Sequence, residues 1–139
     1  MASWTSAPSP TGQAERGIVH RSGSGDLFDL VRSEVGPNLR PFAQHLWEVR
    51  WDRRDGPPRS SQTIPFPSVN LTVETGTSGE TRHGHPLPAA LVHGVVTRTF
   101  RIALADSGWA CGVKFRPGGW SAWMLLWMSS RSGEVVGRE

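Results

Sequence analysis

Three histidines that lie close together in the sequence are the residues best suited to chemistry. His83 and His85 form a His-x-His pair, and His93 follows a few residues later. If residues 82–85 form a short strand, the alternation of side chains points both rings of the pair to the same face. Two imidazoles on one face, completed by a third, are a donor set that binds zinc and iron. His83, His85 and His93 are therefore the candidate metal ligands.

The surroundings of these histidines favour a different interpretation. Pro86 and Pro88 follow the pair directly, and prolines keep this stretch out of the centre of a sheet. Glu80 precedes the pair, and nothing in the sequence forces His93 into the same site. We therefore predict exposed loop histidines, with no metal and no cofactor bound. The alternative is a small metal-dependent enzyme that uses His83, His85 and His93.

A second group of residues suits the binding of an apolar or planar molecule. Tryptophan rings from separate strands could line a pocket, with polar side chains at its mouth. The predicted ligand-binding residues are Trp47, Trp51, Asn70, Lys114 and Arg116. The same rings could equally form the core of so small a domain, because each removes a large area from water. Arg116 could equally donate hydrogen bonds to carbonyl groups of the neighbouring turn.

Several functional classes are disfavoured by composition. The sequence offers no recognisable catalytic triad and no phosphate-binding glycine loop, so we predict no catalytic residues and no enzyme activity. The formal charge is +3, and the basic residues are scattered rather than clustered, so we do not expect this chain to bind nucleic acid itself. Cys111 is the single cysteine, which indicates a reducing compartment and a buried, inert thiol. There is no secretory signal and no long apolar run, so we expect a cytoplasmic protein without membrane contact.

The elements that must position these residues are mostly strands. Apolar and polar residues alternate with a period of two, and clusters of glycine, proline and charged residues separate the runs. The expected strands cover residues 42–51, 69–73, 82–85, 91–101 and 109–115. Their short lengths and regular spacing predict a mainly β domain, a small barrel or sandwich with one or two short flanking helices.

The ends of the chain differ in composition from its centre. Residues 1–25 are rich in serine, proline and glycine, and we predict that they are disordered. Leu27, Leu30 and Val31 fall at helical spacing, which predicts a short helix over 26–35 at the start of a domain spanning 26–120. Residues 121–139 then form a short helix and a polar tail. Trp123 and Trp127 lie on one stripe of this helix, which we expect to pack on the domain or to pair with a second copy.

Four ordered blocks resemble a known family. The most specific is the run Gly112-Val113-Lys114-Phe115-Arg116-Pro117-Gly118-Gly119, followed by Trp120. The other blocks are Arg40-Pro41-Phe42 with His45, Trp47 and Trp51-Asp52; residues 64–71; and Gly94 with Thr97-Arg98 and Phe100. Over residues 36–120 the sequence resembles an uncharacterised domain found at the N-terminus of AraC-type bacterial transcriptional regulators.

This resemblance implies a cupin-like sensing domain and a role in the regulation of transcription. It implies a small-molecule effector, and dimerisation through a helix that follows the barrel, here residues 120–128. DNA would be bound only through a helix-turn-helix domain that this chain lacks, so we expect a regulator truncated before that domain. A natural stand-alone domain and a frame-shifted product are alternatives, as is a separate binding module lined by aromatic residues. In metal-binding cupins a glutamate follows the His-x-His pair, whereas here Pro86 and Pro88 do.

Overall fold

The computed structural model describes residues 18–19, 28–63 and 66–131. The elements, in chain order, are β1 (Ile18–Val19), β2 (Asp29–Ser33), β3 (Ala43–Arg53), β4 (Arg59–Thr63), β5 (Asn70–Glu74), β6 (Thr81–Arg82), β7 (His85–Pro86), β8 (Ala89–His93), β9 (Phe100–Leu104), β10 (Asp106–Phe115) and α1 (Gly119–Arg131). The predicted mainly β fold class is confirmed.

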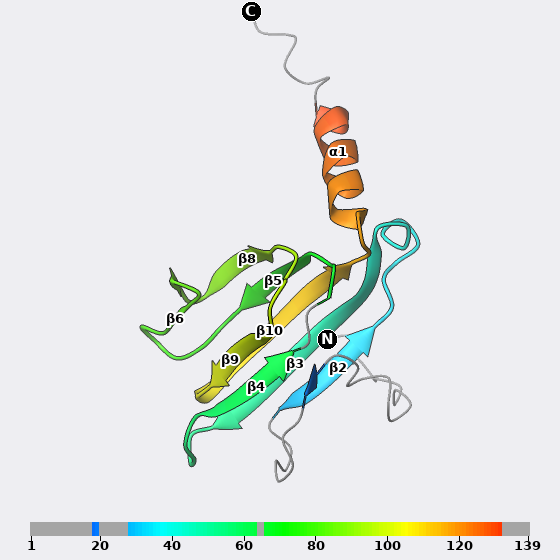
Figure 1. The fold of residues 1–139 in the computed structure, drawn as a ribbon. Coiled ribbons are helices and arrows are strands. Elements are labelled where there is room, and N and C mark those ends of the chain that lie inside the picture. The colour runs from blue at the N-terminus through cyan, green and yellow to red at the C-terminus, as the bar shows by residue number, and fades with distance from the viewer. Residues whose placement is uncertain (1–17, 20–27, 64–65, 132–139) are drawn as a thin grey trace, which may run out of the picture.

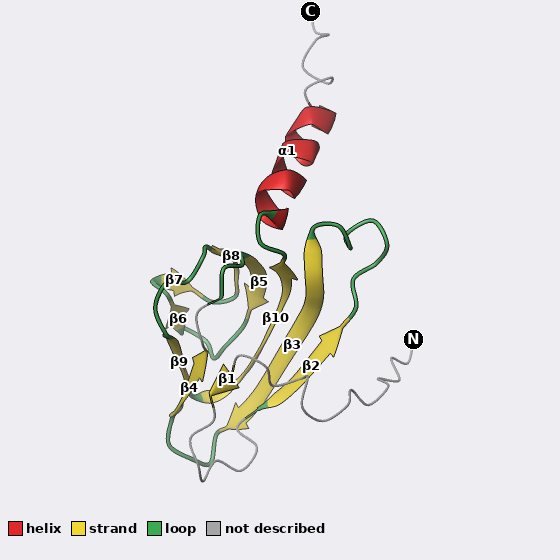
Figure 2. Cartoon of the chain, turned by 45° about the vertical axis from the view of Figure 1, so that its right-hand side comes forward, coloured by secondary structure: helices red, strands yellow, loops and turns green. Residues whose placement is uncertain are grey.

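The described strands form two antiparallel sheets and a hairpin. The larger sheet has the order β2-β3-β10-β5-β8, the smaller one β1-β4-β9, and β6 pairs with β7 alone. The smaller sheet lies over one face of the larger sheet (Figures 1 and 2). Within the described part of the chain this pairing closes no barrel, so the sandwich half of the predicted architecture describes the fold better.

The core lies between the two sheets. Trp51 and Ala110 of the larger sheet pack with Leu104 of the smaller one, and all three are buried. The indole Nε1 of Trp51 also donates a hydrogen bond to the carbonyl of Ala105 at 3.0 Å, which ties β3 to the segment after β9. Burial of this large ring, together with its satisfied N–H group, fixes how the sheets face each other.

The inner face of β10 is the face opposite to the predicted one. The alternation of Trp109, Cys111, Val113 and Phe115 with small or charged residues predicts that these four side chains lie inside, yet Trp109 is 38% exposed and Ala110 only 7%. Small residues lie inside because the rings of β3 need the space. A Cβ on Gly112 would lie 2.9 Å from the Trp47 ring. Val113 is half-buried rather than buried, whereas Phe115, beyond a register shift, is buried at 2% exposed.

The N-terminal helix predicted over 26–35 is wrong. Residues 29–33 form β2 instead, which pairs with β3 from Asp29 opposite Arg50 to Ser33 opposite Leu46. Backbone pairing along the edge of the sheet outweighs a helical spacing of only three apolar residues. Ile18 and Val19, predicted to be disordered, form β1 on the edge of the smaller sheet. The rest of the predicted disordered segment and the tail from 132 onward lie outside the described residues.

Helix α1 projects from the end of the larger sheet (Figure 1). A turn precedes it, in which Gly119 N donates to Arg116 O at 2.8 Å and Gly118 has φ 75°, as the Pro-Gly sequence predicts. Trp120 and Trp123 pack against Phe115, with ring centroids 5.1 and 5.8 Å away. The helical prediction is thus confirmed for 119–131, and its first turns dock on the sheet. Within the described ranges, no helix has the length and apolar character needed to span a membrane.

Candidate functional site

A buried polar group lies on the inner face of β5. Thr72 and Glu74 are 2% and 4% exposed, whereas Val73 between them is 43% exposed. An alternating strand with its apolar residues inside would instead bury Val73 and expose its polar neighbours. Thr72 Oγ1 donates to Glu74 Oε1 at 2.8 Å, and His93, at the end of β8, places Nε2 2.9 Å from the same oxygen. Strand pairing between β5 and β8 therefore brings a carboxylate and an imidazole together.

Arg82 holds the other side of this carboxylate. Its guanidinium donates to Glu74 Oε2 at 3.2 Å and to Glu80 Oε1 at 2.7 Å, and the Arg82 side chain is only 5% exposed. Its Cζ also lies 5.1 Å from the centroid of the Trp51 ring, on the core side. Two carboxylates and an aromatic face thus compensate one buried cation, as burial of an arginine requires.

A tight hairpin places His83 beside this group. Residues 82–85 were predicted to be one strand, but His83 and Gly84 form the two-residue turn between β6 and β7. Both have positive φ, 52° and 79°, the combination that a type I′ hairpin turn needs. The turn separates His83 from His85 and brings the His83 ring to within 5.3 Å of the His93 ring, centroid to centroid.

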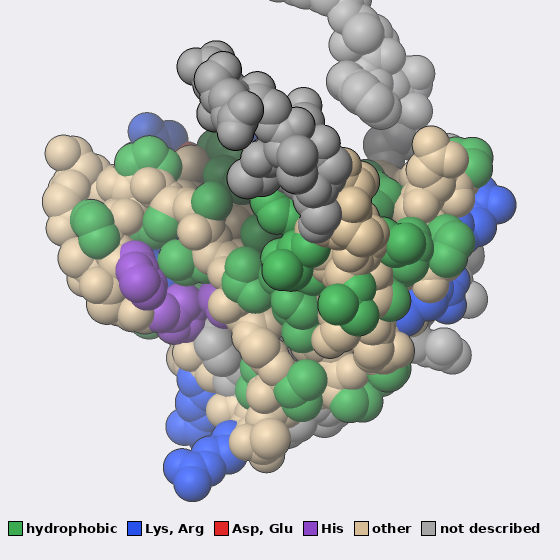
Figure 3. All heavy atoms as spheres, turned by 90° about the horizontal axis from the view of Figure 1, so that it is seen from above, with side chains coloured by type: hydrophobic (Ala, Val, Ile, Leu, Met, Phe, Trp, Pro, Cys, Tyr) green, Lys and Arg blue, Asp and Glu red, His purple; other side chains and the backbone are tan. Residues whose placement is uncertain are grey.

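Glu74, His83 and His93 together form a compact set of potential metal ligands within the described part of the chain. One ligand atom from each lies within 4.8 Å of the ligand atoms of the other two, and His85 is outside this set. Histidine side chains gather in one patch on the face seen in Figure 3. His83 and His93 are two of the three candidate ligands named from the sequence, and Glu74 is a carboxylate beside them that the sequence lacks after the His-x-His pair.

The pKa values of Glu74 and His83 suit metal ligands at neutral pH. Burial by itself would raise the pKa of Glu74, but hydrogen bonds from His93, Thr72 and Arg82 outweigh it and lower the pKa to about 2. Burial, and then the charge of His93, lower the pKa of His83 below its ordinary value. The carboxylate is therefore ionised and the His83 imidazole neutral, which are the forms that bind metal ions.

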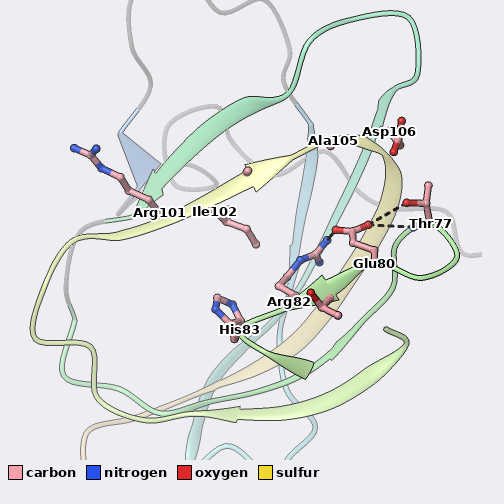
Figure 4. A pocket seen from close by; sticks show the side chains of 10 residues that line it. Thr77, Glu80, Arg82, His83, Arg101, Ile102, Ala105 and Asp106 are labelled. Carbon is pink, nitrogen blue, oxygen red and sulfur yellow. Dashed lines mark hydrogen bonds and ion pairs between the residues drawn. The ribbon is translucent and has the colours of Figure 1, made fainter. Parts of the chain in front are cut away.

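An open cleft of about 360 Å³ adjoins the group on the His83 side (Figure 4). One wall comes from residues 77–83, the loop after β5 with β6 and the hairpin turn. The other wall comes from 101–106, the end of β9 and the turn into β10. Glu80 and Arg82 point toward each other across the cleft floor, whereas Arg101 lies at the rim and points away. Ile102, Ala103 and Ala105 make one wall largely apolar.

Comparison with known proteins gives a family. The model of a domain of unknown function, DUF6597, matches residues 35–136, which is most of the chain. The chain belongs to the DUF6597 family. No curated protein and no solved structure matches it. The DUF6597 match includes every strand from β3 onward together with Glu74, His83 and His93. The family description assigns no activity to the DUF6597 domain.

The ligand-binding residues predicted from the sequence of this DUF6597 domain do not meet at the cleft. Trp47 donates from Nε1 to Asn70 Oδ1 at 3.2 Å, which joins two strands across β10. Trp51 is a core residue with 6% exposure. Lys114 places Nζ 3.8 Å from the centroid of the Phe66 ring. None of these side chains lines the cleft.

Arg116 and Cys111 of the DUF6597 domain also lie away from the cleft. Arg116 Nε donates to the carbonyl of Arg40 at 3.0 Å, so it anchors the loop before β3 rather than the neighbouring turn that the alternative interpretation named. Cys111, predicted to be buried, is only half-buried on the outer face of β10, and this partial burial raises the pKa of its thiol.

Proposed function

We propose that this chain is a ligand-sensing domain of an AraC-type transcriptional regulator and that it binds a small polar molecule in the cleft beside His83. The observation that carries the proposal is the cleft itself. Its volume of about 360 Å³ lies in the range of small-molecule sites, and it combines an apolar wall with a few charged groups. The resemblance of residues 36–120 to the sensing domains of these regulators supports the same function.

The cleft suits a compact molecule with both polar and apolar parts. Thr77 and Glu80 offer oxygen atoms on one wall, and Ile102 and Ala103 offer apolar contact on the other. The guanidinium of Arg82 is already held by Glu74 and Glu80, so it would fix the shape of the cleft more than it would capture an anion. We therefore expect uncharged or amphoteric molecules to bind better than simple anions.

Blocking the cleft tests this proposal. Ala103 is exposed on β9 and lines the cleft, so Ala103→Trp would fill the space without entering the core. Ala90, an exposed alanine on β8 away from the cleft, gives the matched control Ala90→Trp. A panel of sugars, amino acids and nucleosides is screened by thermal shift on the full chain. We expect at least one compound to raise the melting temperature of wild type and of Ala90→Trp but not that of Ala103→Trp.

Two outcomes would contradict the sensing proposal. One is a panel in which no compound stabilises the wild type. The other is a compound that stabilises Ala103→Trp as much as it stabilises wild type and Ala90→Trp, because such a compound would bind outside the cleft.

We also propose that the chain forms a homodimer through α1. The observation that favours pairing is the exposure of Leu125 and Leu126, at 68% and 56%, on a helix that projects away from the sheets. Exposed apolar surface of this kind commonly marks an association site. Trp123 already contacts Phe115, so it is unsuitable for a test of pairing.

Light scattering on the full chain tests the pairing proposal. We expect a dimer for wild type and a monomer for Leu125→Glu/Leu126→Glu, with the melting temperature of the sheets little changed. A wild-type monomer at the highest concentration measured would contradict the proposal.

A further inference from the structure

We propose that Glu74, His83 and His93 form a binding site for a single divalent metal ion, with Zn²⁺ as the preferred occupant. Two imidazoles and one carboxylate are the ligand set of open, three-ligand zinc sites, in which a fourth position is left for water or another ligand. The inference goes beyond the sensing function, because it concerns the metal alone and holds whether or not an organic molecule occupies the cleft.

The distances within the group fit one cation. Ligand atoms on a shared tetrahedral zinc ion lie about 3.3 Å apart, given zinc–ligand bonds of about 2.0–2.1 Å. Glu74 Oε1 and His93 Nε2 are 2.9 Å apart, and the whole set lies within 4.8 Å. The required separation falls between these values, so small rotations of the side chains suffice to place all three around an ion.

The carboxylate is held in the orientation that a metal needs. Arg82 occupies Oε2 of Glu74, which leaves Oε1 directed at His93. Thr72 Oγ1 donates a hydrogen bond to this oxygen at 2.8 Å, so it steadies the carboxylate. Neighbours of this kind are typical of metal sites, where they fix the direction of the ligating atoms.

The local charge also favours a cation. Glu74 and Glu80 bring two negative charges to the single positive charge of Arg82, so the network keeps a net negative charge when the imidazoles are neutral. A divalent ion at Oε1 would offset this charge in a region largely removed from water, where the Glu74 side chain is 5% exposed.

The backbone conformation of the hairpin turn determines where the His83 side chain lies. His83 is not glycine, yet it has φ 52°, a conformation that non-glycine residues adopt infrequently. Asparagine, aspartate and glycine are the usual residues at this turn position. In this turn conformation the His83 ring lies 5.3 Å from the His93 ring, centroid to centroid, so the hairpin backbone places the side chain at the ligand set.

The site is also accessible from solvent. His83 is an exposed residue and lines the cleft, whereas Glu74 is buried, so an ion entering from the cleft would meet the imidazole first. The open coordination position would then face the cleft, where a water molecule or another oxygen or nitrogen atom can complete the tetrahedron.

Isothermal titration of the EDTA-treated full chain with ZnCl₂ tests the inference. We expect one Zn²⁺ per chain with a Kd at or below about 1 µM, and a weakening of at least about 100-fold in His83→Ala and in His93→Ala. His85→Ala removes a neighbouring histidine outside the ligand set and should bind like wild type. His83 is at an exposed turn, so His83→Ala should fold, which circular dichroism checks.

Elemental analysis after gel filtration in micromolar zinc gives the stoichiometry independently. Zinc bound by wild type and His85→Ala but lost from folded His83→Ala supports the site. The inference is overturned if wild type retains no stoichiometric zinc. It is also overturned if His85→Ala weakens binding as much as His83→Ala does, because the ion would then be held by loop histidines and not by the Glu74 group.

Discussion

Replacing Glu74 by glutamine in the metal-free protein should remove a large part of its stability. The Arg82 side chain is 5% exposed and would lose one of its two carboxylate partners. Breaking a buried ion pair by removing one partner costs about 3–5 kcal/mol, and the remaining bond to Glu80 places this case at the lower end.

The pKa of Glu74 leads to the same magnitude. It is lowered from 4.5 to about 2 in the folded chain, which corresponds to about 3 kcal/mol of stabilisation at neutral pH. Since the folded-state pKa is the lower one, this stabilisation is present above pH 4.5 and is lost as the pH falls toward 2. The difference between wild type and Glu74→Gln should therefore shrink over that range.

Urea unfolding in EDTA at several pH values measures both effects. At neutral pH we expect the midpoint of Glu74→Gln to lie about 2 M below that of wild type, for a loss of about 3 kcal/mol. Glu34→Gln is the matched control, because the Glu34 side chain is 93% exposed, and it should change stability by less than about 0.5 kcal/mol. If Glu74→Gln is as stable as Glu34→Gln, or if the difference does not depend on pH, the reasoning about this buried network is refuted.

Two further predictions concern other parts of the fold. Burial, and then the charges of Arg32 and Lys114, lower the pKa of His45 from 6.5 to about 4, so stability should fall as the pH drops through that interval. An NMR titration of the His45 ring with a midpoint above 6 would contradict this. Gly112→Ala places a Cβ 2.7 Å from a backbone carbonyl oxygen and should cost about 1–3 kcal/mol in urea unfolding. Gly94→Ala, with nothing within 4 Å, should be nearly neutral, and equal effects of the two substitutions would disprove the packing argument.

The β-rich fold could be predicted from the sequence because alternation and turn residues are local signals. The sequence did not allow us to predict which face of each strand lies inside. On β10 the small residues Ala110 and Gly112 face the core, because Trp47 and Trp51 of the neighbouring strand fill the space above them. The size of a side chain on one strand therefore depends on the side chains of the adjacent strand as well as on its own burial. The adjacent strand is known only once the strand pairing is known.

The candidate site could be predicted only in part, for a related reason. The histidines could be named from the sequence because imidazole is a common metal ligand. Glu74 could not, because it comes close to His93 only through the pairing of β5 with β8, which local sequence patterns do not reveal. Gly84 was the signal that could have been used, since a residue followed by glycine between two short strands favours a two-residue turn. That turn separates His83 from His85 and decides which of the two joins the ligand set.

The most direct test of the proposed binding function is to record ¹⁵N–¹H NMR spectra of the full chain while adding the compound that stabilises it most in the thermal-shift panel. We expect the amide signals of residues 77–83, which form one wall of the cleft, to shift in proportion to occupancy. Shifts confined instead to Trp47, Asn70 and Lys114 would show that the compound binds at the residues predicted from the sequence. That result would contradict the proposal that the cleft is the binding site.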